Sequence, residues 1–156
     1  MTKAEIVEKP GAGEVIALRA EMFSETPEPG QPARLLGSEC PACGERFFPR
    51  RKYCAACTGG GLRDVILGPG GKVETYTIVR QQLPGSAMVP PYAIVNVRLG
   101  KGPTVQTVVR EGYESLTIGQ AVVLMVEPVL EEDGRTYVSF VARVEPNQQA
   151  GLREGK

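Results

Sequence analysis

Four cysteines are the residues whose types and spacing most clearly indicate chemistry in this 156-residue chain. They form two Cys-x-x-Cys pairs, Cys40 with Cys43 and Cys54 with Cys57, in the stretch SECPACGERFFPRRKYCAACTGG, and the sequence contains no other cysteine. Each pair can form a tight turn that directs two thiolates at one metal ion, and four thiolates around a tetrahedral zinc leave no open coordination position. Such an ion contributes folding free energy rather than Lewis acidity. We therefore predict one structural Zn²⁺ per chain.

Iron and disulfides are the alternatives to zinc at these cysteines. The first pair reads CPACG, which resembles one knuckle of rubredoxin, whereas the second reads CAACT and lacks the matching Pro and Gly. Two disulfides are disfavoured in a reducing compartment, where thiols are kept reduced. Zinc is the preferred interpretation, and metal analysis distinguishes the three.

Composition excludes several function classes. The chain has no histidine, so it cannot supply a Ser-His-Asp triad, a Cys-His pair or a His-ligated catalytic zinc. Eighteen basic and eighteen acidic residues give a net charge of zero, so no whole-molecule field attracts nucleic acid or an anionic membrane. The sequence shows neither an apolar run of membrane-span length nor the apolar core of a secretory signal, and we expect a cytoplasmic protein.

A basic and aromatic segment lies between the two cysteine pairs. It consists of Arg46, Phe47, Phe48, Arg50, Arg51, Lys52 and Tyr53. The cations are suited to phosphate groups and the aromatic rings to stacking on a base, as in nucleotide or nucleic-acid binding. The alternative is that Phe47 and Phe48 cover the small ribbon core while the cations face water.

The elements that must position these residues differ along the chain. Residues 1–33 form an N-terminal extension in which Val15, Leu18 and Met22 have helical spacing, so we expect a short helix over 14–23, followed by an extended linker, SETPEPGQPA. The alternative is an extension that becomes ordered only against a partner. Residues 34–67 carry the cysteines and match a rubredoxin-like zinc ribbon, to which the segment LRDVIL adds a strand.

Residues 68–146 predict a second domain that is entirely β. Five segments rich in β-forming residues read KVETYTIVR, YAIVNVRL, TVQTVVR, AVVLMV and YVSFVARV. Asp133-Gly134 predicts a hairpin between the last two, and EGYESLTIG has room for a helical turn between the third and fourth. This pattern favours a five-stranded OB-fold barrel, with an SH3-like barrel as the alternative. The GPGG break at Gly68–Gly71 marks the domain boundary, and residues 147–156 are expected to form a flexible tail.

The order of these motifs resembles a known family. CPACGERFFPRRKYCAAC, GGKVETYTIV, PPYAIVNVRL, LTIGQAVVLMVE and YVSFVARV, taken in that order, look like the zinc-ribbon/OB-fold protein family associated with thiolases and acyl-CoA metabolism. The resemblance covers residues 34–144. Its most specific parts are the cysteine spacing with Phe48-Pro49-Arg50, the Gly71, Val73, Thr75 and Thr77 stretch, Pro91-Tyr92 and Ile118-Gly119.

The resemblance implies a small accessory subunit, not catalytic by itself, that binds a thiolase-like or ketoacyl-synthase-like enzyme in a hetero-oligomer and helps to form its acyl-CoA site. We expect Arg46, Phe48, Arg50, Arg51 and Lys52 to contact coenzyme A or the partner. The composition agrees with a subunit that is not catalytic by itself, because a chain with no histidine and no spare cysteine lacks the nucleophile and base that thiolysis requires. The alternative function is a single-stranded nucleic-acid-binding module built from the same ribbon and barrel.

Overall fold

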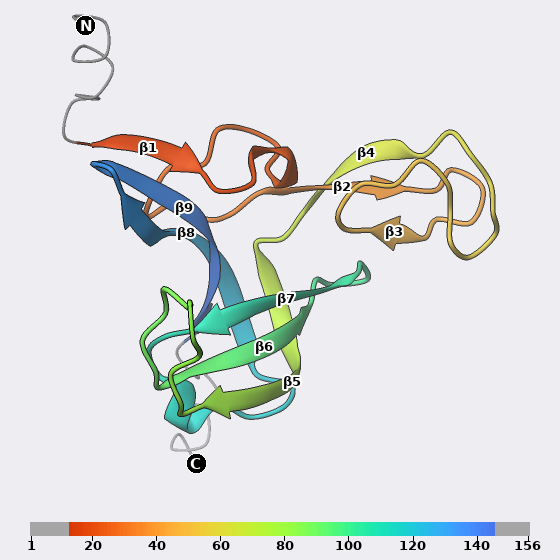
Figure 1. Ribbon diagram of the computed structural model, residues 1–156. Helices are drawn as coiled ribbons and strands as arrows, with labels where there is room; N and C mark the ends of the chain where they lie inside the picture. The colour runs from red at the N-terminus through yellow and green to blue at the C-terminus, as the bar shows by residue number, and fades with distance from the viewer. Residues whose placement is uncertain (1–12, 146–156) are drawn as a thin grey trace, which may run out of the picture.

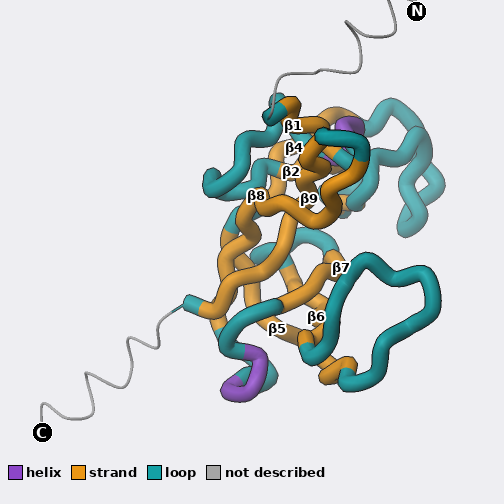
Figure 2. Tube along the Cα trace, turned by 60° about the vertical axis from the view of Figure 1, so that its left-hand side comes forward, coloured by secondary structure: helices purple, strands orange, loops and turns teal. Residues whose placement is uncertain are grey.

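The computed structural model of the protein describes residues 13–145, which form a three-stranded sheet and a six-stranded sheet (Figure 1). In chain order the elements are β1 (Glu14–Ala17), the 3-10 turn η1 (Ala20–Met22), β2 (Leu35–Glu39), β3 (Arg46–Phe47), β4 (Arg63–Leu67), β5 (Gly70–Val79), β6 (Tyr92–Arg98), β7 (Thr104–Val109), the 3-10 turn η2 (Tyr113–Ser115), β8 (Ala121–Glu132) and β9 (Arg135–Val144). The predicted mainly β fold is confirmed. Figure 2 shows that helix is confined, within these residues, to single turns.

The barrel is built from β5 to β9, and each of the five predicted strands is present. β5 pairs with both β6 and β8, β6 pairs with β7, and β8 pairs with β9, all antiparallel. β7 then lies beside β9, where the buried Thr107 hydroxyl donates to the Phe140 carbonyl over 2.8 Å and closes the barrel. The first barrel strand, β5, thus lies between the second, β6, and the fourth, β8. This is the arrangement of an OB-fold and not of the SH3-like alternative.

The two predicted turns of the barrel also form. Asp133 and Gly134 adopt positive φ angles of 52° and 72°, as a type I′ hairpin turn requires, and they join β8 to β9. The segment between β7 and β8 contains η2, a single 3-10 turn. Local turn chemistry is therefore sufficient to place both connections.

Alternating residues of the strands fill the barrel core. β6 shows the pattern most clearly, because Ala93, Val95 and Val97 are fully buried while Ile94 and Asn96 are partly exposed. The remaining core side chains in the barrel come from its other strands and connections: Val73, Leu99, Val105, Val109, Leu116, Val122, Leu124, Val126, Val138 and Ala142. Alternate residues of β6 thus face the barrel core.

The N-terminal extension differs from the predicted helix. Residues Glu14–Ala17 form a strand that pairs in parallel with Arg135–Val138 of β9, and the helical spacing yields only the η1 turn. A short helix without a buried apolar face is marginal in water, and in the observed structure Val15 and Leu18 remain 41% and 51% exposed. The open edge of β9 offers backbone hydrogen bonds instead. The first twelve residues of the extension and the expected tail lie outside the described residues.

The ribbon sheet consists of β2 with β3 on one side and β4 on the other, so the predicted strand in LRDVIL is confirmed. Gly68 and Pro69 separate β4 from β5. The domain boundary at residue 68 itself stays a prediction. Ribbon and barrel share one apolar cluster, to which β2 contributes Leu35 and β4 contributes Leu67. In addition, Phe48 packs edge-on against Phe140 of β9 at 5.9 Å, and the β6–β7 turn at Gly102 lies against Leu67.

The described residues contain no helix that is long and apolar enough to cross a membrane.

Gly71 provides a test of close packing between β5 and β6. A Cβ atom at Gly71 would lie 2.5 Å from Val97 Cγ1 and 2.7 Å from the Arg98 carbonyl, whereas a Cβ atom at Gly70 meets nothing within 4 Å. Gly71→Ala should lower the free energy of unfolding by about 1 to 3 kcal/mol, because the backbone carbonyl cannot move away cheaply. Urea denaturation measures the change, with Gly70→Ala as the matched control. Equal effects of the two substitutions would contradict this packing.

Candidate metal centre

The two Cys-x-x-Cys turns have the same backbone geometry. The Cys40 N–H donates to the Glu45 carbonyl over 2.9 Å and the Gly44 N–H donates to the Cys40 carbonyl over 2.8 Å. The second turn repeats both bonds fourteen residues later: the Cys54 N–H donates to Gly59 over 2.8 Å and the Thr58 N–H to the Cys54 carbonyl over 3.0 Å. Each turn therefore presents its two sulfur atoms in the same way.

The two turns face each other and bring all four predicted ligands together. The Cys40 and Cys57 sulfur atoms lie 3.6 Å apart and those of Cys43 and Cys54 lie 3.5 Å apart, and all four sulfur atoms are within 4.8 Å of one another. A zinc–sulfur bond of about 2.3 Å places the sulfur atoms of a tetrahedron about 3.8 Å apart. The donor set and its spacing thus fit a tetrahedral thiolate-bound metal ion.

Backbone amides prepare one sulfur of each turn for metal binding. The Cys43 and Ala42 N–H groups directed at the Cys40 sulfur hold the pKa of Cys40 at about 7. The Cys57 and Ala56 N–H groups likewise lower the pKa of Cys54, whose sulfur they approach at 3.4 and 3.3 Å. Cys40 and Cys54 are buried, so two thiolates are favoured inside the site before the ion completes their neutralisation.

The other two thiols stay protonated in the metal-free state. The Glu45 N–H alone lowers the pKa of Cys43, but the adjacent Cys54 sulfur and burial outweigh it and raise that pKa to about 12. The pKa of Cys57 is also raised, since the Cys40 and Cys54 sulfur atoms outweigh the Gly59 N–H. An ion that binds all four sulfur atoms must therefore displace protons from Cys43 and Cys57.

Glu39 is a charged group of the ribbon that the sequence did not single out. It precedes Cys40 at the end of β2 and lies opposite Arg46 of β3 and Arg63 of β4. Its carboxylate accepts hydrogen bonds from Arg46 Nε over 2.6 Å and Arg63 Nε over 3.0 Å, although its side chain is only 13% exposed. These bonds, with the Arg63 bond the stronger, lower the pKa of Glu39. One carboxylate thus links all three strands beside the metal centre.

The basic and aromatic segment divides into bound and free side chains. Arg50 pairs with Asp64 at 3.3 Å on the surface, and the Arg51 guanidinium lies 5.2 Å from the centre of the Phe47 ring. Lys52 and Tyr53 are exposed, Tyr53 to 69%. Arg46 is bound to Glu39, and Phe48 packs against the barrel. Of the five residues expected to contact coenzyme A or a partner, the exposed ones are Arg50, Arg51 and Lys52.

Comparisons with known proteins agree with this geometry. The family model described as the ChsH2 rubredoxin-like zinc ribbon domain matches residues 28–63, and the model described as the ChsH2 C-terminal OB-fold domain matches residues 64–127. The chain belongs to this ribbon and OB-fold family. The resemblance to a zinc-ribbon/OB-fold family is therefore confirmed. The ribbon model precedes the OB-fold model along the chain, in the order that the cysteines and strands indicate.

Relatives in this family cover most of the chain. A DUF35 domain-containing scaffold protein of Methanothermobacter thermautotrophicus is 28% identical over 114 residues, which are 72% of this chain and 86% of that protein. A protein of the same description from Pyrococcus furiosus is 36% identical over 72 residues, 46% of this chain and 52% of that protein. A solved structure described as "Ltp2-ChsH2(DUF35) aldolase" superposes with a TM-score of 0.58 at 25% identity, covering 71% of this chain and 84% of that chain.

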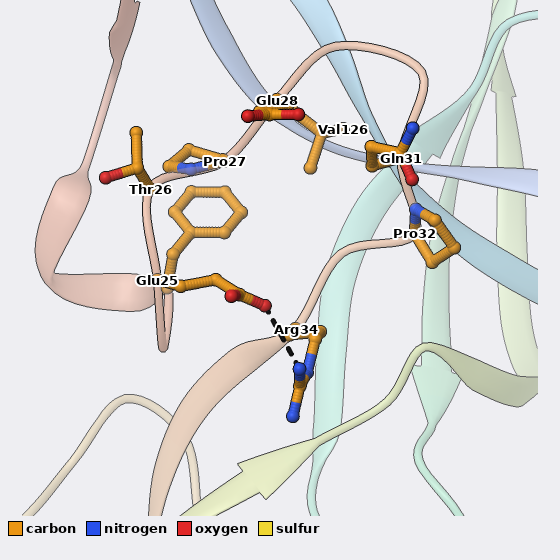
Figure 3. A pocket seen from close by; sticks show the side chains of 9 residues that line it. Glu25, Thr26, Pro27, Glu28, Gln31, Pro32, Arg34 and Val126 are labelled. Carbon is orange, nitrogen blue, oxygen red and sulfur yellow. Dashed lines mark hydrogen bonds and ion pairs between the residues drawn. The ribbon is translucent and has the colours of Figure 1, made fainter.

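A cavity of about 350 Å³ beside the linker does not add a second chemical site. Figure 3 shows Glu25 and Arg34, which form an ion pair of 3.1 Å at this cavity. The other labelled side chains that line it are Thr26, Pro27, Glu28, Gln31, Pro32 and Val126. The Phe23 ring fills its floor and packs against Phe140. Since Glu25 and Arg34 pair with each other and are exposed to water, we assign the cavity no chemistry.

Removal of the metal should separate the stabilities of ribbon and barrel. A chelator is expected to unfold residues 36–66 while the barrel keeps its β structure, because the barrel strands supply most of the apolar core and the ribbon strands add only Leu35 and Leu67 to its buried part. Amide hydrogen exchange before and after chelation measures this. Protected amides throughout the ribbon of the metal-free protein, or loss of protection in β5 to β9 as well, would contradict the expectation.

Gly44 and Thr58 occupy equivalent positions, and both have positive φ angles, 77° and 63°. A β-branched residue is strained there, whereas glycine is not. Thr58→Gly should make the free energy of metal binding more favourable by about 0.5 to 1 kcal/mol, and Gly44→Ala should make it less favourable by about 1 kcal/mol. Competition with a chromophoric chelator measures both variants. Changes of the same sign would show that the two turns are not equivalent.

Proposed function

We propose that this chain is a non-catalytic, zinc-binding accessory subunit of a thiolase-type acyl-CoA enzyme, acting in the cytoplasm. The observation that carries the proposal is the similarity, over 71% of the chain, to a ChsH2(DUF35) chain solved with Ltp2 and described as an aldolase. The scaffold description of the archaeal relatives supports an accessory role. Thiolases and aldolases both make or break a carbon–carbon bond next to an activated carbonyl, so one kind of accessory subunit is compatible with either catalyst.

The residues of this chain support placing the catalysis elsewhere. All four cysteines converge on one site, and the chain has no histidine to act as a general base. Four thiolates leave no coordination position for a substrate, so the ion we assign to them is a structural zinc, one per chain. The nucleophile and base of the reaction would belong to the partner subunit.

We assign contact with coenzyme A or the partner to the accessible end of the ribbon. Arg50, Arg51 and Lys52 are exposed there, and their charges are suited to the phosphate groups of coenzyme A. Arg46 and Phe48 contribute indirectly, because Arg46 holds Glu39 and Phe48 fixes the ribbon against the barrel. Against a nucleic-acid backbone, Arg46 is already engaged with Glu39, and the chain has no net positive charge to attract it.

Purification of the tagged chain from its native lysate tests the proposal. Mass spectrometry should identify a stoichiometric thiolase-like or aldolase subunit, and metal analysis of the same eluate should give one zinc per chain. The purified complex should turn over acyl-CoA thioesters that neither subunit converts alone. A chain that emerges alone, or with RNA, would refute the accessory role; iron in place of zinc would refute the metal assignment.

Arg50→Ala combined with Arg51→Ala tests the ribbon contact within that complex. We expect the Kd for the partner or the apparent KM for the acyl-CoA to rise about tenfold, because charge-assisted hydrogen bonds are lost. Arg19→Ala is the matched control, since Arg19 is an exposed cation outside the ribbon whose surface pair with Glu21 contributes little. Unchanged binding and KM in the double variant would remove the role of these arginines while leaving the complex itself intact.

A further inference from the structure

The connection between β5 and β6, residues 80–91, exposes apolar side chains that the metal centre and core do not use. Its sequence is RQQLPGSAMVPP. Val89 is 80% exposed, the highest value among the large exposed apolar residues of the described chain, and Leu83 is 54% exposed. Scattered single apolar residues need no explanation on a protein surface, but a concentration of them on one protruding loop indicates an interaction site.

Hydrogen bonds within this loop hold its shape. Gln82 Nε2 donates to the Ser86 carbonyl over 3.1 Å and to the Leu83 carbonyl over 3.4 Å. The Ser86 hydroxyl accepts the Met88 N–H over 3.1 Å, and the Ser86 N–H donates to the Leu83 carbonyl over 3.1 Å. The loop thus holds its shape by its own hydrogen bonds while the Leu83 and Val89 side chains remain exposed. Such preorganisation lowers the entropy lost on binding.

The loop occupies the end of the barrel away from the ribbon. β6 runs from the loop at Tyr92 to the β6–β7 turn, whose Gly102 lies against Leu67 of the ribbon. Figure 1 shows the green loop between the end of β5 and the start of β6, standing off the barrel. A cavity of about 290 Å³ lies behind it, lined by Met88, Val89, Tyr92 and, from neighbouring segments, Arg110 and Pro128.

The charges around the loop indicate the chemistry of its partner. The chain has no acidic residue between Glu74 and Glu111, and Arg80 is the only charged residue of the loop. Arg80 follows β5 and Arg110 follows β7, so the pairing of β5, β6 and β7 places both arginines at the loop end of the barrel. Arg110 pairs with Glu127 at 3.9 Å, so Arg80 is the charge that the loop itself presents to a partner. An apolar cleft rimmed by carboxylates is the complementary surface.

We propose that the 80–91 loop is a second docking element, which inserts Leu83 and Val89 into an apolar, acid-rimmed cleft of the catalytic subunit. This inference rests on the proposed accessory function and adds to it a contact surface separate from the ribbon arginines. Val89 and Leu83 enter the cleft, Gln82 and Ser86 keep the loop in its binding conformation, and Arg80 pairs with the rim.

The experiment uses the full chain and the catalytic subunit identified by co-purification, both purified, with the Kd measured by calorimetry. Val89→Asp should weaken binding at least about 30-fold, as truncation or charging of a central interface residue does. Ile118→Asp is the matched control, because Ile118 is an equally exposed apolar residue, at 72%, outside the loop, and its substitution should leave the Kd unchanged. Arg80→Glu should weaken binding about tenfold at low salt and less at high salt.

Gln82→Ala tests preorganisation, and it should weaken binding about threefold to tenfold while leaving the unfolding midpoint of the barrel in place. Equal Kd values for the wild type and Val89→Asp would overturn the loop proposal and leave the accessory function standing. Absence of any catalytic subunit with the wild type would overturn both. A wild-type chain that is dimeric by ultracentrifugation and becomes monomeric on Val89→Asp would assign the loop to self-association and overturn the proposal as well.

Discussion

The ribbon depends on the cross-link through its four sulfur atoms, because its three strands enclose very little apolar side chain. β3 contains two residues and β2 and β4 five each, and sheets of this size do not hold together in water without further support. The two cysteine turns supply that support from both sides. Backbone N–H groups stabilise Cys40 and Cys54 as thiolates, so part of the electrostatic cost of assembling four sulfur atoms is already met by the chain.

The charged groups next to the metal centre extend this cross-link across the sheet. Glu39 is bound on either side by an arginine of a neighbouring strand, and its low exposure makes these bonds stronger than ordinary surface ion pairs. Loss of one arginine would leave a poorly hydrated carboxylate beside two buried thiolates. Glu39, Arg46 and Arg63 therefore hold the ribbon sheet together. The exposed cations farther along the ribbon are Arg50, Arg51 and Lys52.

The relation between ribbon and barrel determines what the protein can present to a partner. The Phe48 and Phe23 rings both pack edge-on against Phe140, so the ribbon and the linker meet on the same strand of the barrel. The β6–β7 turn fills the space beside Leu67. These contacts fix the accessible ribbon end at one side of the molecule and the apolar 80–91 loop at the other.

Several features follow from the sequence by itself. The cysteine spacing determined which four sulfur atoms come together, since a Cys-x-x-Cys turn is a local structure, and segments rich in β-forming residues determined the five barrel strands. The Asp133-Gly134 pair determined its hairpin for the same local reason. The absence of histidine was sufficient to remove several catalytic mechanisms from this chain.

Other features were decided only by the tertiary structure. Residues 14–17 have the spacing of a helix but form a strand, because the free edge of β9 provides partners that no local pattern reveals. Arg46 looks like a free cation in the sequence, yet Glu39, seven residues away, binds it beside the cysteine turns. Phe48 belongs to the barrel contact for the same reason. Long-range pairing, unlike turn chemistry and strand alternation, depends on which surfaces the complete fold brings together.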